Sequence, residues 1–150
     1  MSYEVTADDP QFLRHIMRQR GFSARPHLNG NGSWVIGYGR DLRMNPLAEA
    51  EGRWLLERDL FKCENAMVAD WPKAEGLDAV RYYACLNVVH GSGIEYFMSL
   101  RDVRDALEEG DWEQAAIEML RAVPPGRERG EVIELASMLR TGEWPTEDRK

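Results

Sequence analysis

The sequence predicts an α+β fold, with a small β-hairpin lobe, a larger and mostly helical lobe, and a cleft between them. Two observations support this fold class. The segment Ser33–Gly39 has the aromatic and β-branched content of a strand and follows a turn signal, whereas everything after Asn45 has helical spacing. The chain has 150 residues, 43% of them hydrophobic, which fits a single domain, 1–150, with lobes at 10–45 and 46–145.

A first helix is expected to begin at Pro10 and to end before Gly21. Asp9 is a good N-cap residue, and proline suits the first helical position. Gly21 supplies the backbone freedom with which helices commonly end. Four apolar side chains fall on one face at helical spacing, namely Phe12, Leu13, Ile16 and Met17.

The next segment has β character. Asn29-Gly30-Asn31-Gly32 is a tight-turn signal, because Asn and Gly tolerate the positive φ angles of short hairpin turns. Ser33–Gly39 then follows as a short strand. The sequence therefore predicts one small hairpin and gives no reliable signal for further strands.

The remaining elements are expected to be helices separated by caps and breaks. Asp78 and Asp111 are the expected N-caps, Pro124-Pro125-Gly126 is a break, and Gly142 is a C-terminal glycine. The expected helices run from Asn45-Pro46 to Trp71-Pro72, from Asp78 to about His90–Gly93, from Tyr96 to Leu107, from Asp111 to Arg121, and from Glu131 to Arg140.

The charge balance disfavours several classes of partner. The formal net charge is −7 and the pI is about 5.0, whereas nucleic-acid binding requires a basic face. The same charge opposes long-range attraction to anionic walls and membranes. No apolar run approaches the roughly 18 residues of a membrane span. The first ten residues lack the basic and apolar regions of a signal peptide, so we expect a cytoplasmic location where the protein is made.

The cysteines and histidines give no sign of a metal or redox site. Cys63 and Cys85 each lie in an apolar helical pattern, which favours structural thiols over a disulfide or a reactive thiol. His15, His27 and His90 do not have the spacing of metal ligands. We therefore expect no metal and no cofactor.

Several segments, taken in order, carry a resemblance to a known family. On these segments, which extend over about Gln11 to Trp144, the chain resembles the phage-type lysozymes, glycoside hydrolase family 24. The resemblance implies a lysozyme-like fold and peptidoglycan as the family's substrate. The segments are Arg20-Gly21, Trp34–Arg40, Leu77–Arg81, Leu86–Val89, Gly110–Ala116 and Leu139–Trp144.

The positions that the resemblance marks as catalytic are occupied by unsuitable residues. The family uses a Glu at the end of the first helix as general acid, an Asp in the hairpin turn that supports the attacking water, and a Thr that holds this water. The corresponding residues are Arg20, Asn29 and Val35. Arginine does not release a proton near neutral pH, asparagine has no carboxylate and valine has no hydroxyl. Because Pro10–Arg40 contains no Asp or Glu, a shifted alignment restores no carboxyl there.

Two ion pairs follow from the same resemblance. Glu131 takes the position of an Arg near the family's catalytic Glu, which implies a charge-reversed Arg20–Glu131 pair. The alternative is that Glu131 is a solvated first-turn residue favoured by the helix dipole. Arg40 and Asp59 take the positions of a His–Asp pair, so we expect a structural ion pair between them.

The cleft offers further binding candidates besides Arg20, Asn29 and Glu131. Asn87 lies in one of the matched segments. Trp34 lies on the hairpin, where it is a candidate for stacking on sugar, whereas the other tryptophans are expected to pack inside the lobes. His27 and His90 are expected to be surface or packing residues.

The sequence thus favours a catalytically inactive lysozyme-like protein, a pseudoenzyme of phage or prophage origin that binds a protein partner. Peptidoglycan glycan that is held without cleavage is a second candidate ligand. The alternative is an active muramidase, an endolysin acting through relocated carboxylates with Glu131 as the candidate acid. A third hypothesis is a structural component of a virion or secretion assembly.

Overall fold

The computed structural model describes residues 9–149, and its chain forms two compact units. These are the amino-terminal unit, Met1–Arg53, and the carboxy-terminal unit, Trp54–Lys150. The boundary falls inside helix α2 (Glu49–Asp70), eight residues after the lobe boundary expected at residue 45. The single domain stays a prediction, and the first eight residues, on which the expectation of no signal peptide depends, lie outside the described part.

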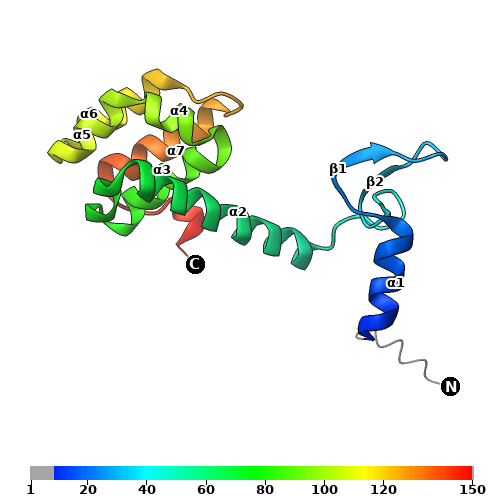
Figure 1. Cartoon of the computed structure of the whole chain (residues 1–150). Helices are drawn as coiled ribbons and strands as arrows, with labels where there is room; N and C mark the ends of the chain where they lie inside the picture. The colour runs from blue at the N-terminus through cyan, green and yellow to red at the C-terminus, as the bar shows by residue number, and fades with distance from the viewer. Residues whose placement is uncertain (1–8, 150) are drawn as a thin grey trace. The chain divides into compact units, whose positions relative to one another are not determined.

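Helix α1 (Pro10–Arg20) has the predicted bounds and the predicted caps (Figure 1). The Asp9 carboxylate accepts hydrogen bonds from the backbone N–H groups of Gln11 and Phe12, at 2.8 and 3.1 Å. Gly21 ends the helix with a φ of 69°. Within its unit the helix meets the sheet at its carboxy-terminal end, and none of its residues is buried.

The sheet has three antiparallel strands in the order β1 (Ser23–Leu28), β2 (Trp34–Gly37) and β3 (Arg40–Asp41). The predicted hairpin is confirmed, while β3 was not predicted. Two residues are too few to leave an alternating pattern, so β3 is recognisable from its pairing with β2 alone.

Helix α2 begins at Glu49, three residues after the expected Pro46, because Ala48 supplies the first carbonyl of the helical ladder to Gly52. The predicted break at Trp71-Pro72 is confirmed and is followed by a short 3₁₀ helix, η1 (Pro72–Gly76). Helix α3 (Ala79–Ser92) begins after the predicted N-cap Asp78 and ends at Gly93.

The single helix expected over Tyr96–Leu107 is wrong, because the chain forms two helices there. These are α4 (Ile94–Ser99) and α5 (Arg101–Glu109), which are separated at Leu100. The Arg104 guanidinium binds the carbonyl of Met98 at 2.7 Å, and the Ser99 hydroxyl binds that of Tyr96. The carbonyls of Tyr96 and Met98 thus accept hydrogen bonds from side chains at the break between the two helices.

Helix α6 (Trp112–Ala122) begins at the predicted Asp111 cap, whose carboxylate accepts from the N–H of Gln114 at 3.0 Å. Val123 follows with a φ of 42°, a strained backbone conformation for a β-branched residue. Helix α7 (Arg129–Thr141) ends at Gly142, as predicted, with a left-handed φ of 68°. A last 3₁₀ turn, η2, spans Thr146–Asp148.

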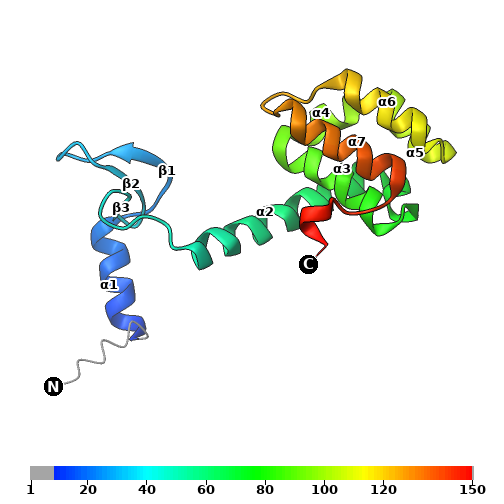
Figure 2. The same ribbon diagram turned by 180° about the vertical axis from the view of Figure 1, so that it is seen from behind.

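The main hydrophobic core lies in the carboxy-terminal unit. There α6 packs on α5 and α7, and α3 packs on α4 and α7 (Figure 2). The Tyr82 hydroxyl on α3 donates to Glu64 on α2 at 2.8 Å, and burial together with this bond raises the pKa of Tyr82 to about 12. The largest fully buried side chains include Phe97, Met67, Leu107, Met119 and Leu139.

Arg81 on α3 contacts four residues of this unit. Its Nε donates to the Leu139 carbonyl at 2.7 Å and its Nη2 donates to the Arg140 carbonyl at 3.0 Å. Its Nη1 pairs with Asp78 at 2.8 Å, and its guanidinium lies 4.1 Å from the centre of the Trp112 ring. The Arg81 side chain is only 11% exposed, so it fixes the end of α7 against α3.

The α+β class is therefore confirmed, with a small antiparallel sheet and a mostly helical remainder. Both cysteines are free thiols, and burial raises the pKa of the Cys85 thiol to about 12. Within residues 9–149, no helix combines the length and the apolar character that crossing a membrane requires.

Candidate functional site

Asn29 holds the hairpin turn together. Its side-chain oxygen accepts hydrogen bonds from the N–H groups of Asn31 and Ser33, at 2.9 and 3.0 Å. Its own N–H donates to the Ser33 carbonyl, and its carbonyl accepts from Gly32. Asn29, the predicted counterpart of a catalytic Asp, thus has a folding role that needs an acceptor oxygen at this point.

Arg20 is the last residue of α1 and is exposed. Its aliphatic carbons cover Gly39, where an added Cβ would lie 3.5 Å from the Arg20 Cδ and where φ is +79°. Arg20, the predicted counterpart of the family's acid, is thus a cation whose aliphatic stem lies against the sheet.

Val35 is the buried apolar residue of the sheet, with 5% of its surface exposed. It pairs across the strands with His27 and with Asp41. The Asp41 carboxylate accepts from the N–H groups of Met44 and Arg43 and from the Ser33 side chain, and these bonds lower its pKa. The carboxylate paired with Val35 is thus engaged in holding a turn.

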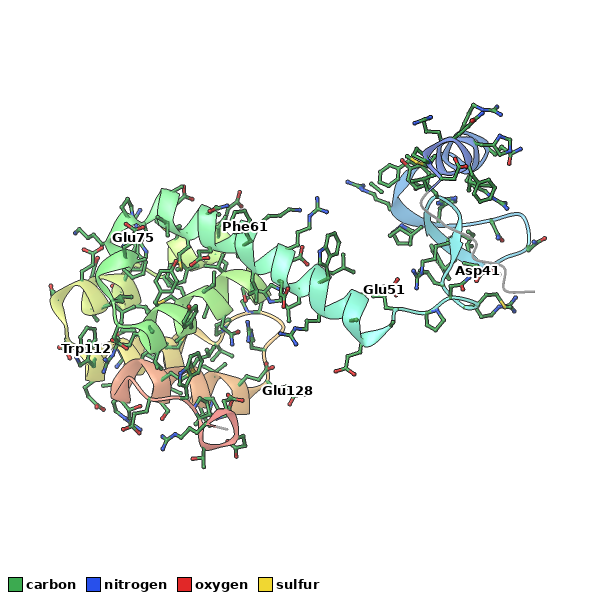
Figure 3. The ribbon with its side chains drawn as sticks, turned by 90° about the horizontal axis from the view of Figure 1, so that it is seen from below. Asp41, Glu51, Phe61, Glu75, Trp112 and Glu128 are labelled. Carbon is green, nitrogen blue, oxygen red and sulfur yellow. The ribbon has the colours of Figure 1, made fainter. Side chains whose placement is uncertain are left out.

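Arg40 binds Glu51 and not the expected Asp59, so that predicted pair is corrected. Nη1 and Nη2 of Arg40 lie 2.7 and 2.9 Å from the two carboxylate oxygens of Glu51, in the first turn of α2 (Figure 3). The same guanidinium also donates to the carbonyls of Asn45 and Pro46. Asp59 is eight residues, or about 12 Å, farther along the helix, whereas Glu51 is reached through a short loop.

The Arg40–Glu51 pair predicts acid sensitivity. Hydrogen bonds from Arg40 and from the Ala48 N–H lower the pKa of Glu51 below its ordinary 4.5. The stabilisation is therefore complete above pH 4.5 and is lost as the pH falls through the lower folded value. We expect Glu51→Gln to lower the thermal midpoint at pH 7 and to flatten its decline toward pH 3.

Thermal unfolding followed by circular dichroism over that pH range tests this prediction. Glu49→Gln is the matched control, since it removes the same charge in the same helical turn and leaves the Arg40 pair in place. Equal pH profiles for the two variants would contradict it.

Trp34 is 54% exposed and lines a hollow of about 410 Å³ with Leu42, Arg43 and the turn residues Asn31 to Ser33. An exposed indole face beside polar groups can stack on a sugar ring. Its candidacy for glycan contact stays a prediction.

Asn87 and His90, on α3, are exposed and line one groove. The Asn87 carbonyl accepts a hydrogen bond of 2.5 Å from Arg127, in the loop before α7. The same guanidinium contacts Gly91, where any Cβ would collide with it. Arg127 thus holds this loop against α3. It was not among the predicted site residues.

Glu131 caps α7. Its carboxylate accepts from the N–H of Glu128 at 3.1 Å, as part of a capping box. It is exposed and lies in the first helical turn, which agrees with the prediction of a solvated first-turn residue. The pair with Arg20, a residue of the other unit, stays a prediction.

An apolar groove of about 620 Å³ lies within the carboxy-terminal unit. Phe61, 64% exposed, projects from α2 on one side (Figure 3). On the other side the rings of Tyr83 and Trp144 are stacked with their centres 5.8 Å apart. We call this the α2–α3 groove; it is lined by Leu56, Glu57, Leu60, Phe61, Glu64, Tyr83, Leu86, Asn87, His90 and Trp144.

The burial of the tryptophans agrees only partly with the prediction that all but Trp34 pack inside the lobes. Trp71 is buried and Trp112 is partly buried, as expected, but Trp54 and Trp144 are 57% and 40% exposed. Within residues 9–149, no three His, Cys, Asp or Glu side chains gather as metal ligands would. The absence of a metal or cofactor stays a prediction.

Comparison with known proteins gives one family. The family model described as phage lysozyme matches residues 17–134, more than half of the chain. The matched region contains Arg20, Asn29, Val35, Asn87 and Glu131. No curated protein matches the chain.

Proposed function

This chain belongs to the phage lysozyme family, and we propose that it is a pseudoenzyme of phage or prophage origin that keeps the fold without cleaving peptidoglycan. The observation that carries the proposal is the chemistry of the first helix and the hairpin. Pro10–Arg40 contains no carboxyl group, and Asp41, the first after it, is engaged by two backbone N–H groups. Glycoside hydrolysis in such families needs a proton donor and a carboxylate beside the scissile bond.

The size of the loss follows from the contributions of these groups. General acid–base groups each accelerate a reaction by about 10²- to 10⁴-fold. Losing both raises the barrier by about 5 to 11 kcal/mol, which removes turnover on a biological timescale.

A relocated mechanism through Glu131 is poorly supported. A general acid has to present a proton to the leaving oxygen. Glu131 instead accepts a hydrogen bond at the start of α7 and faces solvent. A cap residue held in this way stabilises the helix whether or not a substrate is present.

The binding role that replaces catalysis is the recognition of a protein partner. The α2–α3 groove exposes Phe61, Tyr83 and Trp144, and contiguous apolar surface of this kind marks interaction sites. Two carboxylate residues, Glu57 and Glu64, also line it. We therefore assign to the groove a partner segment that presents apolar side chains.

Release of reducing ends from purified peptidoglycan tests the absence of cleavage. The expected result is no release above the buffer level, in the presence of an active muramidase as positive control. Release that disappears in the variant Glu131→Gln would instead support the muramidase alternative.

Binding to the groove is tested with a synthetic Leu/Lys amphipathic helix as the probe, followed by calorimetry. Phe61→Ser is expected to weaken binding at least about tenfold, because it removes apolar contact surface without adding a charge. The control Ile133→Ser alters a residue on α7 that is 50% exposed and outside the groove. Equal affinities of the two variants would contradict the assignment.

A further inference from the structure

The α2–α3 groove has one wall that does not belong to either helix. Of its lining residues, all within residues 9–149, only Trp144 lies outside α2 and α3. The two helices are fixed by buried core residues such as Met67 on α2 and Val88 on α3. The place of Trp144 depends instead on residues 142–149, which follow α7 (red in Figure 1) and which we call the terminal clip.

The terminal clip begins at a fixed point. Arg81, which binds the carbonyls of Leu139 and Arg140, also lies against Gly142, where an added Cβ would be 2.6 Å from its Nη1. Gly142 has a left-handed φ of 68°, which side chains rarely adopt. The end of α7 is therefore held against α3, and any movement of the clip takes place beyond Gly142.

Arg149 closes the clip on itself. Its Nε donates to the carbonyl of Trp144 and its Nη2 donates to the carboxylate of Glu143, both at 2.8 Å. The 3₁₀ turn η2 brings Arg149 back toward these acceptors, and the N–H of Asp148 donates to the Pro145 carbonyl at 3.0 Å within it. One side chain thus fixes the stretch of backbone that carries the Trp144 ring.

The closed clip is held by few contacts. The Trp144 ring is stacked on Tyr83 of α3 at 5.8 Å and 25° between the ring planes. After Leu139 no residue is buried as far as Arg149, the last residue that the structure describes. The pair of Arg149 and Glu143 lies at the surface, where ion pairs contribute little stability. Segments with few buried contacts open at a much lower free energy than the core does.

We propose that the terminal clip is a movable wall of the α2–α3 groove and that Arg149 is the positioning residue that keeps it closed. In the closed state Trp144 lies on Tyr83. In the open state the chain beyond Gly142 moves away and the groove loses this wall. The movement concerns contacts inside the carboxy-terminal unit; only its consequence for binding rests on the proposed function of the groove.

Two-dimensional ¹H–¹⁵N NMR of the full chain tests the movement. The Trp144 indole N–H is assigned as the signal that is lost in Trp144→Phe. Arg149→Ala is expected to shift this signal toward its position in the urea-unfolded chain, because Trp144 leaves the Tyr83 ring, and to leave the other four indole signals in place. Arg149→Lys keeps the charge but lacks the fork that reaches two acceptors, so an intermediate shift is expected.

The matched control is Arg121→Ala. Arg121 is an exposed arginine of the same unit that pairs with Glu118 at 2.8 Å, outside the groove, so this variant should leave the Trp144 signal unchanged. An unchanged Trp144 signal in Arg149→Ala would overturn the proposal. So would a shift of all the indole signals together, which would show that the clip unfolds with the core and is not a separate wall.

The consequence for the groove is measured by calorimetry with the Leu/Lys amphipathic helix. Because the closed clip holds Trp144 in place before binding, Arg149→Ala is expected to weaken binding at least about threefold, and Arg121→Ala is expected to leave it unchanged. If the unchanged protein does not bind the helix, the assignment of the groove to a protein partner fails, while the NMR spectra still decide whether the clip moves. A displaced Trp144 signal with unaltered affinity in Arg149→Ala would contradict the role of the clip as a wall.

Discussion

The triple variant Arg20→Glu, Asn29→Asp, Val35→Thr is expected to release reducing ends from peptidoglycan at least about 100-fold faster than the unchanged protein. The three changes return the acid, the second carboxylate and the hydroxyl that the family's mechanism requires. No single change should suffice, because the acid and the second carboxylate act on the same transition state.

The structure indicates that this variant folds. An Asp at position 29 keeps the acceptor oxygen that binds the N–H groups of Asn31 and Ser33. Arg20 is exposed, so a Glu there requires no repacking. Val35→Thr introduces a hydroxyl at a site that is 5% exposed and costs about 1 to 2 kcal/mol.

A matched variant separates the restored chemistry from the added charge. Arg18→Glu, Asn31→Asp, Val35→Thr makes the same charge changes two residues away on the same helix and the same turn. It is expected to stay inactive. A folded triple variant with no activity would contradict the assignment of Arg20, Asn29 and Val35 to the catalytic positions.

Arg81→Ala is expected to lower the free energy of unfolding by about 3 kcal/mol, the largest effect on stability that we predict. The change leaves the carbonyls of Leu139 and Arg140 without their guanidinium donors and removes the cation–π contact with Trp112. Burial opposes the ionisation of Asp78, but hydrogen bonds from the Arg81 side chain and N–H outweigh it and lower the Asp78 pKa. The pair is therefore formed at neutral pH.

Urea unfolding monitored by far-UV circular dichroism measures this effect. The variant Arg81→Lys keeps the charge but not the planar fork, so we expect an intermediate loss of stability. Arg101→Ala, an exposed arginine on α5, is the control and should change stability by less than about 0.5 kcal/mol. A loss no larger for Arg81→Ala than for this control would show that its hydrogen bonds are not formed in solution.

Features of the fold that depend on neighbouring residues could be predicted from the sequence. The caps at Asp9, Asp78 and Asp111 and the glycine at Gly142 were predicted because each satisfies a backbone group within a few residues of itself. The break at Leu100 was missed, because it depends on Arg104 reaching back to the Met98 carbonyl. Propensity alone favours a continuous helix there.

The same distinction holds for the candidate site. The Asn-Gly-Asn-Gly sequence predicts the turn at Asn29. A position in the first turn of the helix was one of the two predictions for Glu131. The partner of Arg40 could not be predicted, because it depends on the path of the short loop that brings Glu51 to the guanidinium. The α2–α3 groove was missed, since Phe61, Tyr83 and Trp144 lie far apart in sequence and alternate with ordinary core residues.

Asn29 also bears on how such a protein arises. Folding requires an oxygen that accepts two N–H groups at the hairpin turn, and the carboxylate of Asp and the amide of Asn both provide it. Selection for folding alone therefore cannot distinguish the two residues, and catalysis alone preserves the Asp. Where selection for catalysis is relaxed, a change from Asp to Asn at this position leaves the hydrogen bonds of the turn in place, so the fold does not depend on the chemistry of the site.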